Sequence, residues 1–185
     1  MNTKTLLLLA LAVLALPLAY AASGTGTVGV NITSTNQIAV YTSAGTSSSN
    51  LSFVPVSPPA AGTITLETDV ASNMTGGVTG FTVENQGNVN VSINVTSTED
   101  AAAFIGGTSP VFKMWGVDQE AGSCASGLVA KGSAFDLGST GSLVCGKLQY
   151  PDANDQVYAY MTITIPSDAP VAANSATITF TSTQV

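Results

Sequence analysis

Few side chains in this 185-residue chain could perform acid–base or nucleophilic chemistry, because it contains no histidine. A Ser-His-Asp or Cys-His triad and a histidine-based zinc site are therefore excluded. Paired carboxylates could still hydrolyse a glycoside. However, Glu99 and Asp100 are adjacent in sequence and suit the first turn of a helix better. We expect a protein without catalytic residues, cofactor or metal, with a glycoside-active enzyme as the alternative.

Cys124 and Cys145 are the two cysteines of the chain. They form no C-x-x-C motif, and no histidine could complete a metal site with them. In an exported chain, two such cysteines predict one disulfide, worth roughly 3 kcal/mol for a loop of this length. Metal-binding or redox thiols are the alternative.

Two further groups of residues could form binding sites. Asp152, Asn154 and Asp155 form a short acidic loop. Ca²⁺ takes about six to eight oxygen ligands, and this spacing is not that of an EF-hand, so a calcium site stays an open alternative. Trp115 and the tyrosines predict packing in the core or on a sheet face, with a carbohydrate platform as the alternative.

Asn-x-Ser/Thr sequons mark possible glycan sites on an exported chain. Asn90 and Asn94 lie on the polar face of one predicted strand and would point outward. Because Asn, Ser and Thr are abundant here, chance occurrence is the alternative for any single sequon. The candidate positions are Asn31, Asn50, Asn73, Asn90 and Asn94.

The composition limits the classes of molecule that this chain could bind. The formal net charge is −7, with only 4 Lys and Arg residues, so the chain lacks the basic surface that nucleic acid requires. Charged residues are 8% of the chain, so uncharged Ser, Thr and Asn must solvate the surface. Such polar faces combined with β-branched interiors favour sheet over helix.

Residues 1–21 have the features of a secretory signal peptide. Lys4 precedes an apolar run over residues 6–16, and Ala19-Tyr20-Ala21 has the small-x-small cleavage pattern. The run is shorter than the roughly 20 residues that span a bilayer, so we expect no membrane span after cleavage. A pilin-type leader, retained as a filament-core helix, is the alternative. Lys4-Thr5 matches it poorly, and Pro17 ends the run early.

Apolar residues alternate with polar ones along much of the remaining chain, which is typical of β-strands with one buried face. A turn at residues 85–88 predicts a hairpin over residues 78–96. One helix is expected over residues 97–105, capped by Ser97 or Thr98 and ended by Gly106-Gly107. The pattern predicts strands over residues 37–42, 51–56, 62–68, 78–84, 88–96, 111–117, 156–165 and 175–181.

These elements predict an all-β protein, a jelly-roll or immunoglobulin-like β-sandwich of about eight or nine strands with one short helix. Residues 25–34 precede it and alternate cleanly, with Val28, Val30 and Ile32 on one face. Such a strand can pair within its own sheet or join the sheet of a neighbouring subunit.

Three features resemble the TasA/camelysin-like fibre proteins, and especially the bundling pilus subunits of archaea. They are the signal peptide followed directly by an alternating strand, the motif FTVENQGNVNVSINV at residues 81–95, and the ending YMTITIPSDAP…SATITF within residues 160–180. The resemblance implies a jelly-roll subunit that polymerises by donor-strand complementation into extracellular filaments that bundle in biofilm.

Carried over to this chain, the resemblance implies a signal peptide at residues 1–21, a donor strand at 22–34 and a sandwich domain at 35–185. The inserted side chains would be Val28, Val30 and Ile32, and the partners would be identical subunits and neighbouring filaments. The metallopeptidase activity ascribed to camelysins is not carried over, because the chain lacks H-E-x-x-H. A secreted monomeric binding or adhesion module at the cell surface is the alternative function.

Overall fold

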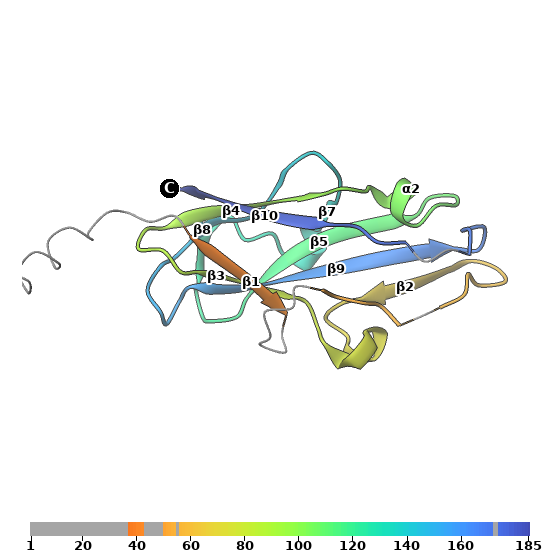
Figure 1. The fold of residues 1–185 in the computed structure, drawn as a ribbon, viewed down its shortest axis with the longest axis horizontal. Coiled ribbons are helices and arrows are strands. Elements are labelled where there is room, and N and C mark those ends of the chain that lie inside the picture. Colours follow the sequence, from red (N-terminus) through yellow and green to blue (C-terminus); the bar gives the residue numbers. More distant parts are fainter. Residues whose placement is uncertain (1–36, 43–49, 55, 172–173) are drawn as a thin grey trace, which may run out of the picture. The chain divides into compact units, whose positions relative to one another are not determined.

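The computed structural model describes residues 37–42, 50–54, 56–171 and 174–185, all within the unit Thr35–Val185. These residues form two antiparallel sheets that face each other (Figure 1). The expected signal peptide and donor strand lie outside the described residues. The prediction of an all-β sandwich with a single short α-helix is confirmed for the described part.

Each sheet has a simple strand order. The larger sheet runs β1-β3-β9-β5-β7, with β2 also paired to β9, and the smaller runs β10-β4-β8-β6. The larger sheet contains β1 (Ile38–Thr42), β2 (Thr63–Glu67), β3 (Phe81–Asn85), β5 (Val111–Asp118), β7 (Phe135–Asp136) and β9 (Gln156–Pro166). The smaller contains β4 (Val91–Ser97), β6 (Cys124–Ser126), β8 (Ser142–Leu148) and β10 (Ile178–Gln184).

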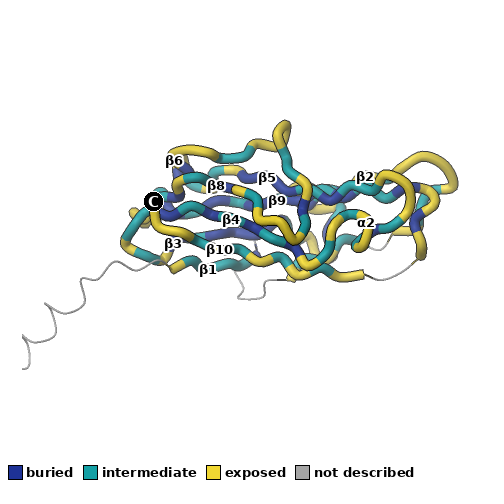
Figure 2. The backbone as a smooth tube through the Cα atoms, turned by 90° about the horizontal axis from the view of Figure 1, so that it is seen from above, coloured by how far each residue is buried: buried dark blue, intermediate teal, exposed yellow. Residues whose placement is uncertain are grey.

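The core lies between the sheets, where Figure 2 shows a band of buried backbone. It follows from the alternation of the two most regular strands, because successive side chains of a strand point to opposite faces. In β4, Val91, Ile93 and Val95 are at most 1% exposed, and in β9 Val157 and Ala159 are fully buried. Each large apolar side chain buried this way contributes about 1.5–3 kcal/mol.

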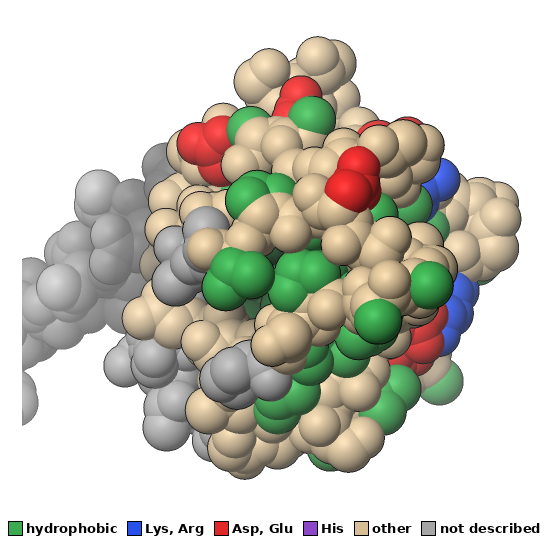
Figure 3. All heavy atoms as spheres, turned by 90° about the vertical axis from the view of Figure 1, so that its right-hand side faces the viewer, with side chains coloured by type: hydrophobic (Ala, Val, Ile, Leu, Met, Phe, Trp, Pro, Cys, Tyr) green, Lys and Arg blue, Asp and Glu red, His purple; other side chains and the backbone are tan. Residues whose placement is uncertain are grey.

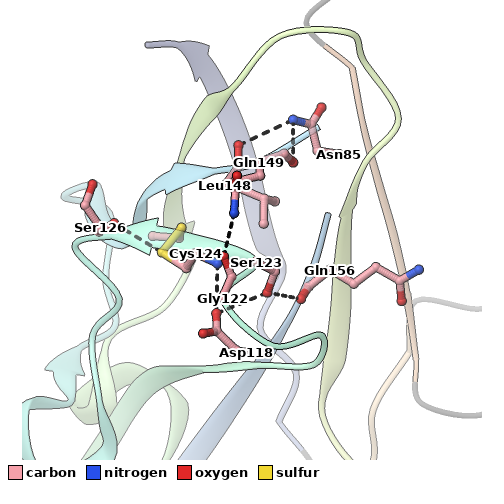
Figure 4. Close-up of a disulfide and its surroundings, with 10 residues drawn as sticks. Asn85, Asp118, Gly122, Ser123, Cys124, Ser126, Leu148, Gln149 and Gln156 are labelled. Carbon is pink, nitrogen blue, oxygen red and sulfur yellow. Dashed lines mark hydrogen bonds between the residues drawn. A yellow bond between two sulfur atoms is a disulfide. The ribbon is translucent and has the colours of Figure 1, made fainter. Parts of the chain in front are cut away.

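The predicted hairpin over residues 78–96 is wrong, because β3 and β4 belong to different sheets. The turn between them carries the chain across the sandwich. Asn85 is only 1% exposed and fixes this turn through side-chain hydrogen bonds. Its Oδ1 accepts from the Gly87 amide at 3.0 Å, and its Nδ2 donates to the Val89 carbonyl at 2.8 Å. Nδ2 also donates to the Gln149 carbonyl at 3.0 Å (Figure 4). Both strands have apolar inward faces, so each forms a different side of the core.

The short helix forms where the sequence predicts it but is shorter. It is α2 (Ala101–Phe104), and its cap is Asp100, whose Oδ1 accepts from the Ala103 amide at 2.9 Å. Ser97 lies at the end of β4 instead, and its hydroxyl bonds to the Glu99 carbonyl. Three single 3₁₀ turns complete the helical structure of the described residues: η1 (Ala71–Asn73), η2 (Thr75–Gly77) and η3 (Lys131–Ser133).

The sequence pattern does not predict β6, β7 and β8, and two of the strands that it does predict differ from the structure. The segment predicted as a strand over residues 51–56 forms only an isolated bridge, between Phe53 and Met74, and belongs to neither sheet. The last strand begins at Ile178 rather than at residue 175. Both segments border the groove described below.

Trp115 is a packing residue, as expected. It is 1% exposed although it lies on the outer face of the larger sheet, because Lys131 covers it with its Nζ 4.9 Å from the ring centroid. The same Nζ bonds to Glu67 at 2.9 Å and Asp69 at 3.1 Å, so the η3 loop is tied to β2. Because its ring is covered, Trp115 is not accessible for stacking against a carbohydrate.

The predicted disulfide is confirmed. Cys124 and Cys145 are joined, with Cα atoms 5.9 Å apart, and link the edge strand β6 to β8 (Figure 4). Asp118 also holds β6 in position, because its Oδ1 accepts a hydrogen bond from the Cys124 amide at 2.8 Å. The free-thiol alternative is wrong.

Candidate binding groove between the sheets

A groove of about 960 Å³ opens between the two sheets. The groove opens at one end of the sandwich. This end consists of α2, Gly107 and residues 166–170, and we call it the α2 pole. Figure 3 looks at this pole and shows hydrophobic side chains gathered in a hollow. The opposite end, formed by Asn85 and the loops at residues 119–123 and 151–155, is called the β1 pole, because β1 begins there opposite Asn85.

The floor of the groove consists of core side chains that the sandwich leaves partly uncovered. Phe81 of β3 and Phe180 of β10 meet edge to face across the sheets, with ring centroids 5.7 Å apart. Near the pole, Phe104 of α2 stacks on Phe112 of β5 at 4.7 Å. The remaining floor comes from inward-facing aliphatic residues, namely Leu66, Ile105, Met161, Ile163, Ile165 and Ile178.

The two walls are made differently from the floor. On one side, every residue from Asn174 to Phe180 lines the groove, and on the other side every residue from Asn50 to Val54 does. Successive side chains of an extended chain point to opposite faces. A continuous run of lining residues therefore means that the edge of the chain, with its backbone N–H and C=O groups, faces the groove.

Both sheets also end at this groove. Among the described strands, β10 pairs only with β4, and β2 pairs only with β9. An unpaired edge next to exposed apolar side chains is a template for another strand. Within the described residues, the groove thus combines an apolar floor with the outer strands of both sheets.

Hydrogen bonds fix the mouth of the groove. Asp168 accepts from the Thr108 hydroxyl at 2.5 Å and from its amide at 2.9 Å, and these bonds hold the pKa of Asp168 below its usual value. Asn174 Nδ2 donates to the Phe104 carbonyl at 2.9 Å. Together these bonds hold α2 against the chain that forms one wall.

Gly107 is the residue that allows this close approach. Its φ is +78°, and a Cβ there would lie 2.7 Å from Asp168 Oδ1 and 2.7 Å from Pro166 Cγ. We expect Gly107→Ala to lower the free energy of unfolding by about 1–2 kcal/mol from backbone strain alone, with the clash adding to it. Thermal unfolding measures this as a fall of at least about 2–4 °C in Tm.

Gly62→Ala is the matched control for that variant, because Gly62 has the same φ of +78° and nothing within 4 Å of its Cβ position. Gly107→Ala should lower Tm more than Gly62→Ala. Equal shifts would show that the contact between Gly107 and Asp168 adds nothing to stability.

The other predicted site residues are scattered. Asn50 is exposed on a wall of the groove, while Asn90 and Asn94 are half-exposed. Asn73 is half-buried, and its Nδ2 donates to the Glu67 carbonyl at 3.3 Å, so this sequon is engaged within the fold. Asn31 and the predicted inserting residues Val28, Val30 and Ile32 lie outside the described residues.

No metal-binding cluster forms in the part of the chain that the structure describes. Within it, no group of three or more His, Cys, Asp or Glu side chains is arranged to hold a metal ion, the 152–155 loop included. Asp100, which the sequence places beside Glu99, is occupied as the helix cap. No described helix is long and apolar enough to cross a bilayer.

The sequence alone does not reveal the groove, because its walls come from segments more than 100 residues apart, around Ser52 and Ala176. One signal was available: both segments have strand-like sequences whose predicted bounds the structure does not reproduce. Comparison with protein-family models, curated proteins and solved structures finds no match to this chain.

Proposed function

We propose that this protein is an extracellular filament subunit, in which residues 25–34 of one copy insert as a strand into the groove of the next. The observation that carries this proposal is the groove itself, with its apolar floor and two walls of backbone edge. An exported chain is in keeping with the Cys124–Cys145 disulfide, since such bonds persist in oxidising surroundings.

The alternation of the proposed occupant suits a groove with an apolar floor and an open side. Ten extended residues span roughly 33 Å, and alternate side chains lie about 6.7 Å apart on one face. Val28, Val30 and Ile32 would therefore present three apolar side chains over about 13 Å. The polar face of the same strand, with Thr27 and Asn31, would point toward solvent.

The donor strand would pair with the edges of both walls that face the groove. Along residues 174–180 it would extend the smaller sheet beyond β10, and along residues 50–54 it would give a ladder to the segment that now forms only the Phe53–Met74 bridge. Main-chain hydrogen bonds on the two edges provide affinity, and the apolar floor selects the alternating side chains.

Removing residues 22–34 after the signal peptide tests the proposal. The shortened chain should be secreted as a folded monomer that forms no filaments in negative-stain electron microscopy. It should bind a fluorescent peptide of residues 25–34, because the groove is empty. A peptide of the same composition, with its apolar residues moved onto both faces, is the control and should not bind.

The rival function, a monomeric cell-surface module, makes the opposite prediction. In that case the first strand completes the sheet of its own subunit, and the purified full chain shows no filaments. Filaments that still form after removal of residues 22–34 would show that another surface drives assembly.

A further inference from the structure

Asp155, at the β1 pole, is an unusual carboxylate. It lies just before β9, is only 4% exposed, and its Oδ1 is buried without a hydrogen-bond partner. Among the side chains that the structure describes, it holds the only buried nitrogen or oxygen of this kind. An unpaired buried carboxylate costs several kcal/mol in its charged form, so such groups usually take up a proton instead.

The groups that face Asp155 are themselves acidic. Glu120 lies in the 119–123 loop, and its Oε2 accepts a hydrogen bond from the Asp155 amide at 2.8 Å. Glu84 of β3 and Asp152 of the 151–155 loop add negative charge, and Glu84 in turn accepts a hydrogen bond from the Tyr41 hydroxyl at 2.7 Å. The ion pairs found among the described residues lie elsewhere, on Lys113 and Lys131.

Burial, followed by the charges of Glu120, Glu84 and Asp152, raises the pKa of Asp155 to about 6. The ordinary value for an aspartate is about 3.9. The folded protein therefore holds this proton more tightly than the unfolded chain does. Binding of this proton therefore raises the free energy of unfolding. The gain is complete below about pH 4 and is lost as the pH rises through about 6.

The backbone around Asp155 connects it to the start of β1. Its carbonyl accepts from the Asn85 amide at 2.9 Å, and Asn85 pairs with Ile38, the first residue of β1. Asn154 Nδ2 also donates to the Ala121 carbonyl at 2.6 Å, which joins the two loops of this pole. Repulsion between Asp155 and Glu120 would therefore strain the place where the chain enters the sandwich.

We propose that the Asp155–Glu120 pair is a proton-binding switch: it shares one proton in mildly acidic solution, and loss of that proton loosens the β1 pole. Protonated Asp155 donates a hydrogen bond to the Glu120 carboxylate, whereas the two ionised groups repel each other. The switch goes beyond the filament function proposed above and does not depend on it.

Hydrogen exchange of the full chain, followed by mass spectrometry and corrected for intrinsic rates, tests the switch. Between pH 5 and 7, protection of the peptides that cover residues 84–90 and 151–157 should fall by roughly ten-fold, because only about half of the shift of two pKa units is lost over this pH range. Asp155→Asn should remove this pH dependence. Asp136→Asn, which alters a carboxylate 79% exposed beside Lys113, should leave it unchanged.

Infrared spectroscopy of the same full-length protein gives a second, direct measurement, and it remains decisive if Asp155→Asn fails to fold. The wild-type chain should show a carboxylic-acid band that disappears with a midpoint near pH 6. Glu120→Gln should move the midpoint toward lower pH, because it removes a neighbouring negative charge. A midpoint near pH 4 in the wild type, or one that Glu120→Gln leaves in place, would overturn the proposal.

Discussion

Val30→Asp is expected to prevent filament extension. In the proposed assembly, Val30 is the central side chain of the inserted face, and burying it contributes about 1.5–3 kcal/mol. The substitution also places an unpaired carboxylate against an apolar floor, which costs several kcal/mol more. A combined loss of about 4 kcal/mol weakens subunit association roughly a thousand-fold. Sedimentation and negative-stain electron microscopy of the secreted variant measure the loss.

Thr27→Asp is the matched control, because it adds the same charge to the opposite, polar face of the same strand. It should leave filaments nearly unchanged. Both substitutions lie after the expected cleavage site, so signal processing should be equal in the two variants. If the Val30→Asp chain forms normal filaments, the donor-strand assignment fails, and residues 25–34 belong to the sheet of their own subunit.

Loss of the disulfide should produce the largest fall in stability among the changes to the described part of the chain. Cys124 and Cys145 are 21 residues apart in sequence, and a loop of this length is worth roughly 3 kcal/mol. For a domain of this size, that corresponds to a fall of about 6–12 °C in Tm. We suggest the double variant Cys124→Ala with Cys145→Ala, since it leaves no free thiol.

Reduction of the wild-type protein provides the control for that variant and should lower Tm by a similar amount. Because both cysteines pair within one chain, filaments should show no covalent ladder on non-reducing gels. A double variant as stable as the oxidised wild type would mean that native contacts alone hold β6 against β8, including the bond from the Cys124 amide to Asp118.

Local patterns in the sequence were sufficient to predict the most regular strands and their buried faces, but not β6, β7 and β8, for which the sequence pattern predicts no strand. Alternation in β4 and β9 identified Val91, Ile93, Val95 and Val157 as core residues, because a strand with one buried face must repeat every two residues. The disulfide also followed from the sequence, since the chain offers one pair of cysteines. These features depend on neighbours in the chain or on composition.

The tertiary structure decided which strands meet. The turn at Asn85 has the same sequence features whether it joins two paired strands or carries the chain to the opposite sheet, and only long-range packing distinguishes the two. The groove arises in the same way, where the segments at residues 50–54 and 174–180 come together with none of the described strands between them. The burial of Asp155 beside Glu120 likewise depends on two loops that are distant in sequence, so no local pattern could predict it.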